Sequence, residues 1–166
     1  MKRYTEKKAA NAANKILSDN RHNSKKEALY NPIITDKDGC IVMNEFYALV
    51  FNSAPAGIVS NVDGVSEKHS ESIKALTKLV ENYFNYTREY DPVAVDVPSD
   101  DAIKANPDKA KHRIRISNGQ YVNPAYLRNI LQAFPDARMY SAGRYKPVLF
   151  LSDYGRAALL PIRVLD

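Results

Sequence analysis

The chain has 166 residues, of which 45% are apolar and 26% charged, so it can form one globular domain with its own core. No apolar run approaches the roughly 20 residues of a membrane-spanning helix, and Met1–Glu6 leads into a polar stretch rather than a secretory signal. The single cysteine, Cys40, excludes an internal disulfide and a cysteine-based zinc site. These features predict a cytoplasmic protein with no membrane partner.

The net charge of +5 is concentrated at one end of the sequence. Residues 1–28 contain eight of the 24 Lys and Arg residues and three of the 19 Asp and Glu residues, which leaves 16 of each kind in residues 29–166. Lysine and arginine make most protein contacts with phosphate groups. The N-terminal segment is therefore either a patch for nucleic acid or a solvated basic helix and turn.

Residues 5–18 have the periodicity of a helix. One arc of this helix is small and aliphatic, and consists of Ala9, Ala12, Ala13, Ile16 and Leu17. The opposite arc is polar, and consists of Lys7, Lys8, Asn11, Asn14 and Lys15. We expect the alanine-rich arc to lie close to whatever it covers, and the polar stretch from Ser18 to Lys26 to end the helix.

Three short strands are predicted next, at residues 31–35, 40–43 and 47–51. Residues 36–39 contain two aspartates, as a calcium loop does, but Gly39 is the fourth residue of this segment and a calcium loop requires glycine at its sixth position. A hairpin turn is the better interpretation.

The middle of the chain is predicted to hold one long helix between irregular segments. Residues 52–66 are rich in Ser, Asn, Gly and Pro, and Ser66 is the expected N-cap of a helix that starts at Glu67. The buried stripe of this helix is Ile73, Leu76, Val80 and Tyr83. Residues 88–111 form an irregular connector with three prolines, in which Ser99 is expected to start a helical turn.

The C-terminal third gives the clearest pattern. Residues 112–116 alternate as a strand, Asn118 and Gly119 form a turn, and Asn123 with Pro124 opens a helix that runs to Phe134. Three strands follow, at residues 137–140, 147–151 and 157–164, and residues 153–156 turn the last two into a hairpin. The last strand is apolar on both sides at Leu159 and Leu160, so we expect both of its faces to be covered.

Three blocks of this segment resemble the last motif of the bacterial DNA polymerase III beta subunit, the DNA sliding clamp family. The helix start is similar at Tyr121-Val122-Asn123-Pro124-Ala125-Tyr126-Leu127-Arg128-Asn129-Ile130-Leu131, and the next strand at Lys146-Pro147-Val148-Leu149-Phe150. The family ends on a Met-Pro-Met-Arg-Leu type sequence, which Leu160-Pro161-Ile162-Arg163-Val164 resembles. Residues 5–51 repeat the rhythm of a helix followed by three strands.

The resemblance implies an α+β fold with a single DNA-clamp-like domain over residues 1–166. Two helix-plus-three-strand motifs, at residues 1–51 and 112–166, would place their helices on one face of a curved antiparallel sheet. Residues 52–111 would be an insertion or connector that contains a helix.

The resemblance also implies a role. Clamps surround double-stranded DNA with helices whose Lys and Arg side chains face phosphates without reading sequence. The matching DNA-binding candidates in this chain are Lys2, Arg3, Lys7, Lys8, Lys15 and Arg128. So few cations would require several copies side by side, hence a homo-oligomer. A homodimer and a protein that forms no ring are the alternatives.

The family's last strand also forms part of a hydrophobic cleft that takes short peptides from polymerases and other replication proteins. The residues that match this peptide-binding strand are Leu160, Pro161, Ile162, Arg163 and Val164. The alternative is that these residues only close the sheet.

Nothing in the sequence indicates catalysis. The three histidines lie in unrelated segments, and no metal-ligand spacing, glycine-rich phosphate loop or nucleophile elbow is found. We therefore expect no catalytic residue, metal or cofactor. The favoured hypothesis is a non-catalytic clamp-like protein that contacts DNA or a replication protein. The alternative is a protein-interaction module that never touches DNA, and a small enzyme built on residues 52–66 and 88–111 comes third.

Overall fold

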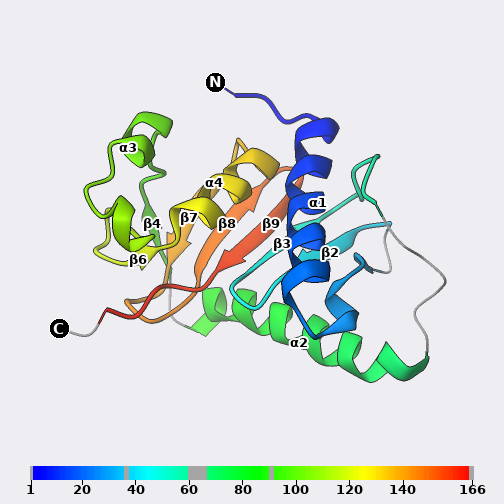
Figure 1. Cartoon of the computed structure of the whole chain (residues 1–166). Helices are drawn as coiled ribbons and strands as arrows, with labels where there is room; N and C mark the ends of the chain where they lie inside the picture. The colour runs from blue at the N-terminus through cyan, green and yellow to red at the C-terminus, as the bar shows by residue number, and fades with distance from the viewer. Residues whose placement is uncertain (1, 36–37, 60–66, 90–91, 165–166) are drawn as a thin grey trace.

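The computed structural model describes residues 2–35, 38–59, 67–89 and 92–164, and the side chains of residues 67–69 and 86–89 lie outside this description. Among these residues the helices are α1 (Glu6–Asn23), α2 (Glu67–Glu89), α3 (Asp100–Lys104) and α4 (Pro124–Ala133), with short 3-10 helices at Glu27–Leu29 and Lys109–Lys111 (Figure 1). The strands are β1 (Ile33–Ile34), β2 (Cys40–Met43), β3 (Tyr47–Phe51), β4 (Val93–Val95), β5 (Ile114–Arg115), β6 (Tyr121–Val122), β7 (Arg138–Ser141), β8 (Val148–Ser152) and β9 (Gly155–Leu159). No described helix is both long and apolar enough to span a membrane.

Seven of the described strands form one antiparallel sheet in the order β1-β2-β3-β9-β8-β7-β4. Strands β1 to β3 follow α1 as a meander, and β7 to β9 follow α4 in the same way. The two meanders meet where β3 pairs with β9, from Tyr47 opposite Leu159 to Phe51 opposite Gly155. The prediction of a mixed α+β protein with a mostly antiparallel sheet is confirmed.

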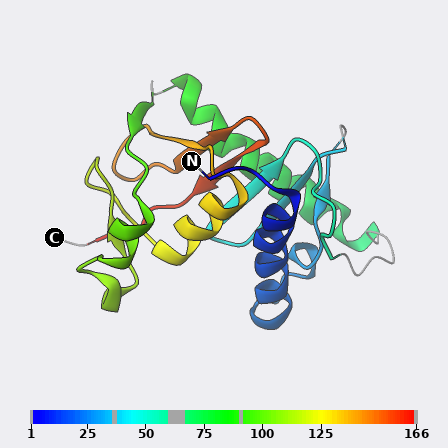
Figure 2. The same cartoon turned by 90° about the horizontal axis from the view of Figure 1, so that it is seen from above.

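Helices cover both faces of this sheet. Helices α1 and α4 lie side by side on one face, and α2 crosses the other (Figures 1 and 2). Of two neighbours on β9, Leu159 belongs to the core under α1 and α4, and Ala158 belongs to the core under α2. Both residues are at most 1% exposed, which confirms that the last strand is covered on both faces. The expected placement of helices on a single face describes α1 and α4 but not α2.

The alanine-rich face of α1 allows α4 to approach closely. Ala9, Ala12 and Ala13 are fully buried there. The amide of Asn129 on α4 donates to the carbonyl oxygen of Ala12 at 3.0 Å and to the hydroxyl of Tyr47 at 2.9 Å. One turn further along α4, Gln132 donates to the carbonyl of Lys8, so the two helices run antiparallel.

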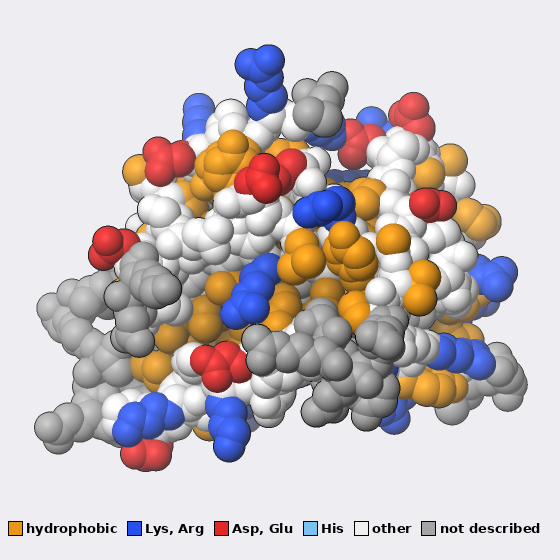
Figure 3. Space-filling view, turned by 180° about the vertical axis from the view of Figure 1, so that it is seen from behind, with side chains coloured by type: hydrophobic (Ala, Val, Ile, Leu, Met, Phe, Trp, Pro, Cys, Tyr) orange, Lys and Arg blue, Asp and Glu red, His pale blue; other side chains and the backbone are white. Residues whose placement is uncertain are grey.

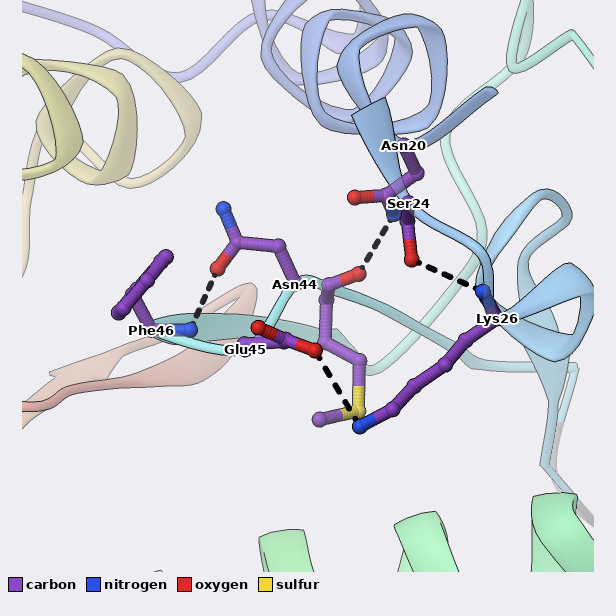
Figure 4. A network of polar contacts seen from close by, with 7 residues as sticks. Asn20, Ser24, Lys26, Asn44, Glu45 and Phe46 are labelled. Atoms are coloured by element: carbon purple, nitrogen blue, oxygen red, sulfur yellow. Dashed lines mark hydrogen bonds and ion pairs between the residues drawn. The ribbon is translucent and has the colours of Figure 1, made fainter. Parts of the chain in front are cut away.

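The predicted end of α1 at Ser18 is wrong, because the helix continues to Asn23. Its last turns are polar in sequence but not all exposed. The side chain of Asn20 is buried and donates to the carbonyl oxygens of Leu29 and Met43, both at 2.8 Å. Figure 4 shows this amide directed toward the turn between β2 and β3. A buried asparagine with such partners supports a helix that hydrophobic periodicity alone does not extend.

The prediction that the last strand continues to Val164 is also wrong, because β9 ends at Leu159. Pro161 follows and cannot donate a backbone hydrogen bond. The backbone N–H of Ile162 instead donates to the carbonyl oxygen of Tyr121 at 2.7 Å. The chain therefore leaves the large sheet and lies along β6.

The region of residues 88–122 holds two strands that were not predicted. Strand β4 extends the large sheet beside β7, although it occupies only three residues of the expected irregular connector. Strand β6 pairs with β5 around the predicted turn at Asn118 and Gly119, so the expected strand over residues 112–116 is shortened to Ile114–Arg115. Ser99 caps α3 as predicted. The expected N-cap at Ser66 and part of the turn at residues 36–39 lie outside the described residues.

Candidate nucleic-acid interface

The outward sides of α1 and α4 form one continuous surface, which we call the helix face. Its exposed side chains are Lys7, Lys8, Asn11, Lys15, Arg128 and Gln132. Thr5 starts α1 by accepting a hydrogen bond from the N–H of Lys8 at 3.3 Å, and Asn123 starts α4 by accepting one from the N–H of Ala125 at 2.9 Å. Four of the six predicted DNA-binding residues are thus brought to one surface.

The other two predicted residues, Lys2 and Arg3, belong to an N-terminal arm that precedes α1. The ring of Tyr4 stacks on that of Tyr154, with 3.8 Å between centroids and 7° between planes. Beyond this anchor, Lys2 forms an ion pair with Asp100 of α3, and Arg3 is exposed. The charge of Lys2 is therefore paired with an acidic side chain of the same protein.

Acidic groups at both ends limit the positive field of the helix face. The hydrogen bond and charge of Lys2 lower the pKa of Asp100, and the charges of Lys104 and Arg128 lower it further. At the other end of α1, the exposed Asp19 adds to the effect of burial in raising the pKa of Tyr126. The uncompensated positive charge is therefore greatest around Lys7, Lys8 and Lys15.

Three of the five residues of the predicted peptide-binding strand have contacts with different elements. The backbone N–H of Leu160 donates to the carbonyl oxygen of Phe46 at 2.9 Å, and Phe46 is 51% exposed. The ring of Phe46 lies 5.8 Å from that of Tyr126. We call Phe46 and Tyr126 the apolar patch, which the backbone of Leu160 borders. Ile162, by contrast, follows β6, and Arg163 lies near Tyr145, with its guanidinium carbon 5.9 Å from the ring centroid.

Sequence reasoning missed Phe46 and Tyr126 as site residues. Phe46 lies in the turn between two strands, and a large aromatic residue in a turn has little chance of burial. That exposure is the signal by which it could have been found.

An open groove of about 750 Å³ lies at the β4 edge of the large sheet, and no feature of the sequence predicted it. We call it the edge groove, because edge strand β4 forms one wall and the β5–β6 hairpin and the β7–β8 loop form the others. Its lining residues are Val93, Ala94, Val95, Arg115, Asn118, Gly119, Tyr121, Ser141, Ala142, Gly143 and Arg144.

A buried glutamine holds the β7–β8 loop against the β5–β6 hairpin. Gln120 is 2% exposed, and its Nε2 donates to the carbonyl oxygens of Gly143, Arg144 and Lys146 at 2.9 to 3.1 Å. Its Oε1 accepts from the hydroxyl of Ser141 at 2.7 Å. Hydrogen bonds therefore join the β5–β6 wall of the edge groove to the β7–β8 wall.

The remaining surfaces give weaker indications of a site. Seen from the side of α2, acidic and basic side chains are interspersed with apolar ones (Figure 3). Within the described part of the chain, no three His, Cys, Asp or Glu side chains are grouped so that they could hold a metal ion. Cys40 is fully buried, and burial raises the pKa of its thiol to about 11.

No family model, curated protein or solved structure matches this chain. The architecture defines an α+β protein with a mostly antiparallel sheet.

Proposed function

We propose that this is a non-catalytic, clamp-like protein that binds double-stranded DNA through the helix face. The observation that carries the proposal is the side-by-side, antiparallel packing of α1 and α4, which leaves Lys7, Lys8, Lys15 and Arg128 exposed on one surface. The resemblance of residues 112–166 to sliding clamps supports it, since that family also turns helices toward the duplex.

The chemistry of the helix face suits a phosphate backbone rather than base edges. Lysine and arginine side chains bind phosphates as charges, while Asn11 and Gln132 add neutral hydrogen-bond donors beside them. Two packed helices hold these groups on a rigid surface. Binding of this kind positions a protein on a duplex without selecting a sequence.

The number of cations sets the strength of the interaction. Each neutralised phosphate contributes a slope of about −0.9 to the logarithmic dependence of affinity on salt. Four cations per chain therefore give weak binding that salt readily abolishes. We therefore include in the proposal several copies that assemble on one duplex as a homo-oligomer.

Fluorescence anisotropy with a labelled duplex tests this function. The variant Lys8→Glu/Lys15→Glu reverses two charges on the helix face, and Lys74→Glu/Lys78→Glu reverses two exposed lysines of α2 on the opposite side. We expect the first variant to bind at least tenfold more weakly at low salt and the control to bind like the unchanged protein. Equal affinities of the two variants, or affinity that is indifferent to salt, would exclude the helix face.

The second candidate is a protein-interaction module that uses the apolar patch to hold a replication protein. Its support is the 51% exposure of Phe46 together with its contact with Tyr126. Exposed aromatic side chains of this kind are common anchors of peptide partners. If Phe46→Ala abolishes capture of a protein partner and Lys8→Glu/Lys15→Glu changes no binding at all, this candidate replaces the first.

A further inference from the structure

The edge groove collects arginine and tyrosine side chains from three separate segments. Arg115 and Tyr121 face each other across the β5–β6 hairpin, and Arg144 lies on the opposite wall. Tyr145 follows Arg144 just outside this lining and is 57% exposed. Arg163 of the C-terminal segment, also outside the lining, lies beside the same ring, with its guanidinium carbon 5.9 Å from the centroid.

The guanidinium groups lie close to aromatic rings. The guanidinium carbon of Arg113 is 4.7 Å from the ring centroid of Tyr121, and that of Arg144 is 5.5 Å from the centroid of Tyr145. Arg113 also forms an ion pair with Asp108, with 3.7 Å between Nη2 and Oδ1. This ion pair holds the guanidinium of Arg113 against the ring of Tyr121. Arg115 and Arg163 form no ion pair with any described residue. Their charges are therefore available to a ligand.

We propose that the edge groove and the adjoining ring of Tyr145 bind single-stranded nucleic acid, with phosphates on Arg115 and Arg144 of the lining and on Arg163 beside it, and a base stacked on Tyr145. Proteins that bind single strands without sequence preference combine a positive groove with exposed aromatic rings, because every base has a π-face. Arginine is the cation best suited to phosphate, since its planar fork donates two parallel hydrogen bonds. The site is separate from the helix face and does not depend on the proposed function.

An acidic peptide is the competing occupant, because strand β4 borders the groove at the edge of the sheet. A peptide added to a sheet edge gains its affinity from a series of backbone hydrogen bonds. Strand β4 has three residues, which is too short for an extended series. The exposed ring of Tyr145, flanked by two guanidiniums, has no role in strand pairing but is suited to a base. These observations favour nucleic acid.

Anisotropy with labelled oligothymidylate and oligouridylate tests the proposal, and a labelled duplex runs beside them. The variant Arg115→Glu/Arg163→Glu reverses one charge in the lining of the groove and one beside it. The control Lys78→Glu/Arg138→Glu makes the same charge change on exposed residues of α2 and β7. Arg138 precedes the buried Met139 on β7 and so faces the α2 side of the sheet. We expect the groove variant to lose at least tenfold in single-strand affinity and the control to lose almost none.

Two further variants test the ring of Tyr145. Tyr145→Ala should weaken single-strand binding about tenfold, whereas Tyr145→Phe should retain it, because stacking requires the ring and not the hydroxyl. Circular dichroism and thermal unfolding establish that each variant is folded.

A third measurement uses the unchanged protein. Photocrosslinking of an iodouridine-containing oligonucleotide, followed by peptide mapping, should label Tyr121 or Tyr145. The absence of single-strand binding at low salt, an unchanged affinity in Arg115→Glu/Arg163→Glu, or crosslinks confined to α1 would overturn the proposal. A glutamate-rich peptide that competes at lower concentration than the oligonucleotide would also overturn it, and would assign the groove to an acidic protein segment.

Discussion

At the scale of single residues, the buried amide of Asn129 joins α4 to both α1 and β3. It is 3% exposed and donates to Ala12 and Tyr47. Burial raises the pKa of Tyr47, and the hydrogen bond from Asn129 partly opposes that rise by favouring the charged form. Both acceptors would lose their buried donor if this side chain were shortened.

We therefore predict that Asn129→Ala lowers the free energy of unfolding by about 1–3 kcal/mol, the usual result of leaving a buried polar group unsatisfied. Urea denaturation followed by circular dichroism measures the change. Asn11→Ala, at an exposed position of α1, is the matched control and should change stability by less than about 0.5 kcal/mol. Similar losses in both variants would contradict a structural role for the Asn129 amide.

The thiol of Cys40 gives a prediction about pH. Burial raises its pKa from 9.0 to about 11, so the folded protein keeps the thiol proton where the unfolded chain releases it. Above about pH 9 the unfolded state binds fewer protons than the folded state, and stability falls as pH rises toward 11. In Cys40→Ala, the loss of stability with pH over this interval should be shallower, as measured by urea denaturation at several pH values.

The same burial makes Cys40 unreactive in the folded protein, because the attacking species is the thiolate. A thiol reagent at pH 8 should modify Cys40 slowly in buffer and rapidly in denaturing urea. Fast modification of the folded protein would show that the thiol is accessible.

At the scale of elements, the described side chains that attach α2 to the sheet form one stripe, in which Val80 and Phe84 are buried and Ile73, Leu76 and Tyr83 are partly buried. Val80 and Phe84 are 1% and 6% exposed, while Leu79, which directly precedes Val80, is 41% exposed. The guanidinium carbon of Arg156 on β9 lies 4.1 Å from the ring centroid of Phe84. The contact of α2 with the large sheet thus depends strongly on this ring.

We predict that Phe84→Ala lowers the free energy of unfolding by about 3 kcal/mol, as the loss of a buried aromatic side chain usually does. Leu79→Ala removes a side chain of similar hydrophobicity from the exposed side of the same helix and should cost less than about 0.5 kcal/mol. Denaturation midpoints of the two variants provide the comparison. If both variants are equally stable, α2 does not pack on the sheet through Phe84.

Elements with strong local signals were predictable from the sequence. The Asn123–Pro124 start of α4 is an example, because the cap bonds to its own helix. The ends of α1 and β9 were not predictable, since Asn20 and Ile162 find their partners on other elements. Strand β4 has three residues and exists because β7 lies beside it. Pairings between distant segments leave little trace in local periodicity.

At the scale of the whole molecule, one candidate site could be predicted from local sequence and the other could not. The lysines of the helix face follow the period of one helix, so the sequence was sufficient to group them. The edge groove joins residues 93–95, 115–121 and 141–144, which only the tertiary structure brings together. Arg163, which was predicted as part of a peptide-binding strand, lies beside Tyr145.

The two edges of the large sheet bear on whether copies of the protein associate before they bind DNA. Edge strands β1 and β4 are two and three residues long, and short edges disfavour pairing between sheets of different copies. We therefore predict that the free protein is largely monomeric, and that copies assemble only along DNA, where phosphates neutralise the repulsion between their positive charges.

Two measurements decide this prediction. Sedimentation of the free protein should give the mass of a single chain, and sedimentation with duplex should give larger species. The helix face of one chain offers four cations, so a monomer on DNA should give a salt slope of about −3.6, and an assembly that binds cooperatively should give a steeper one. A slope near −3.6 at every protein concentration would mean that single chains act alone, and would exclude a ring around the duplex.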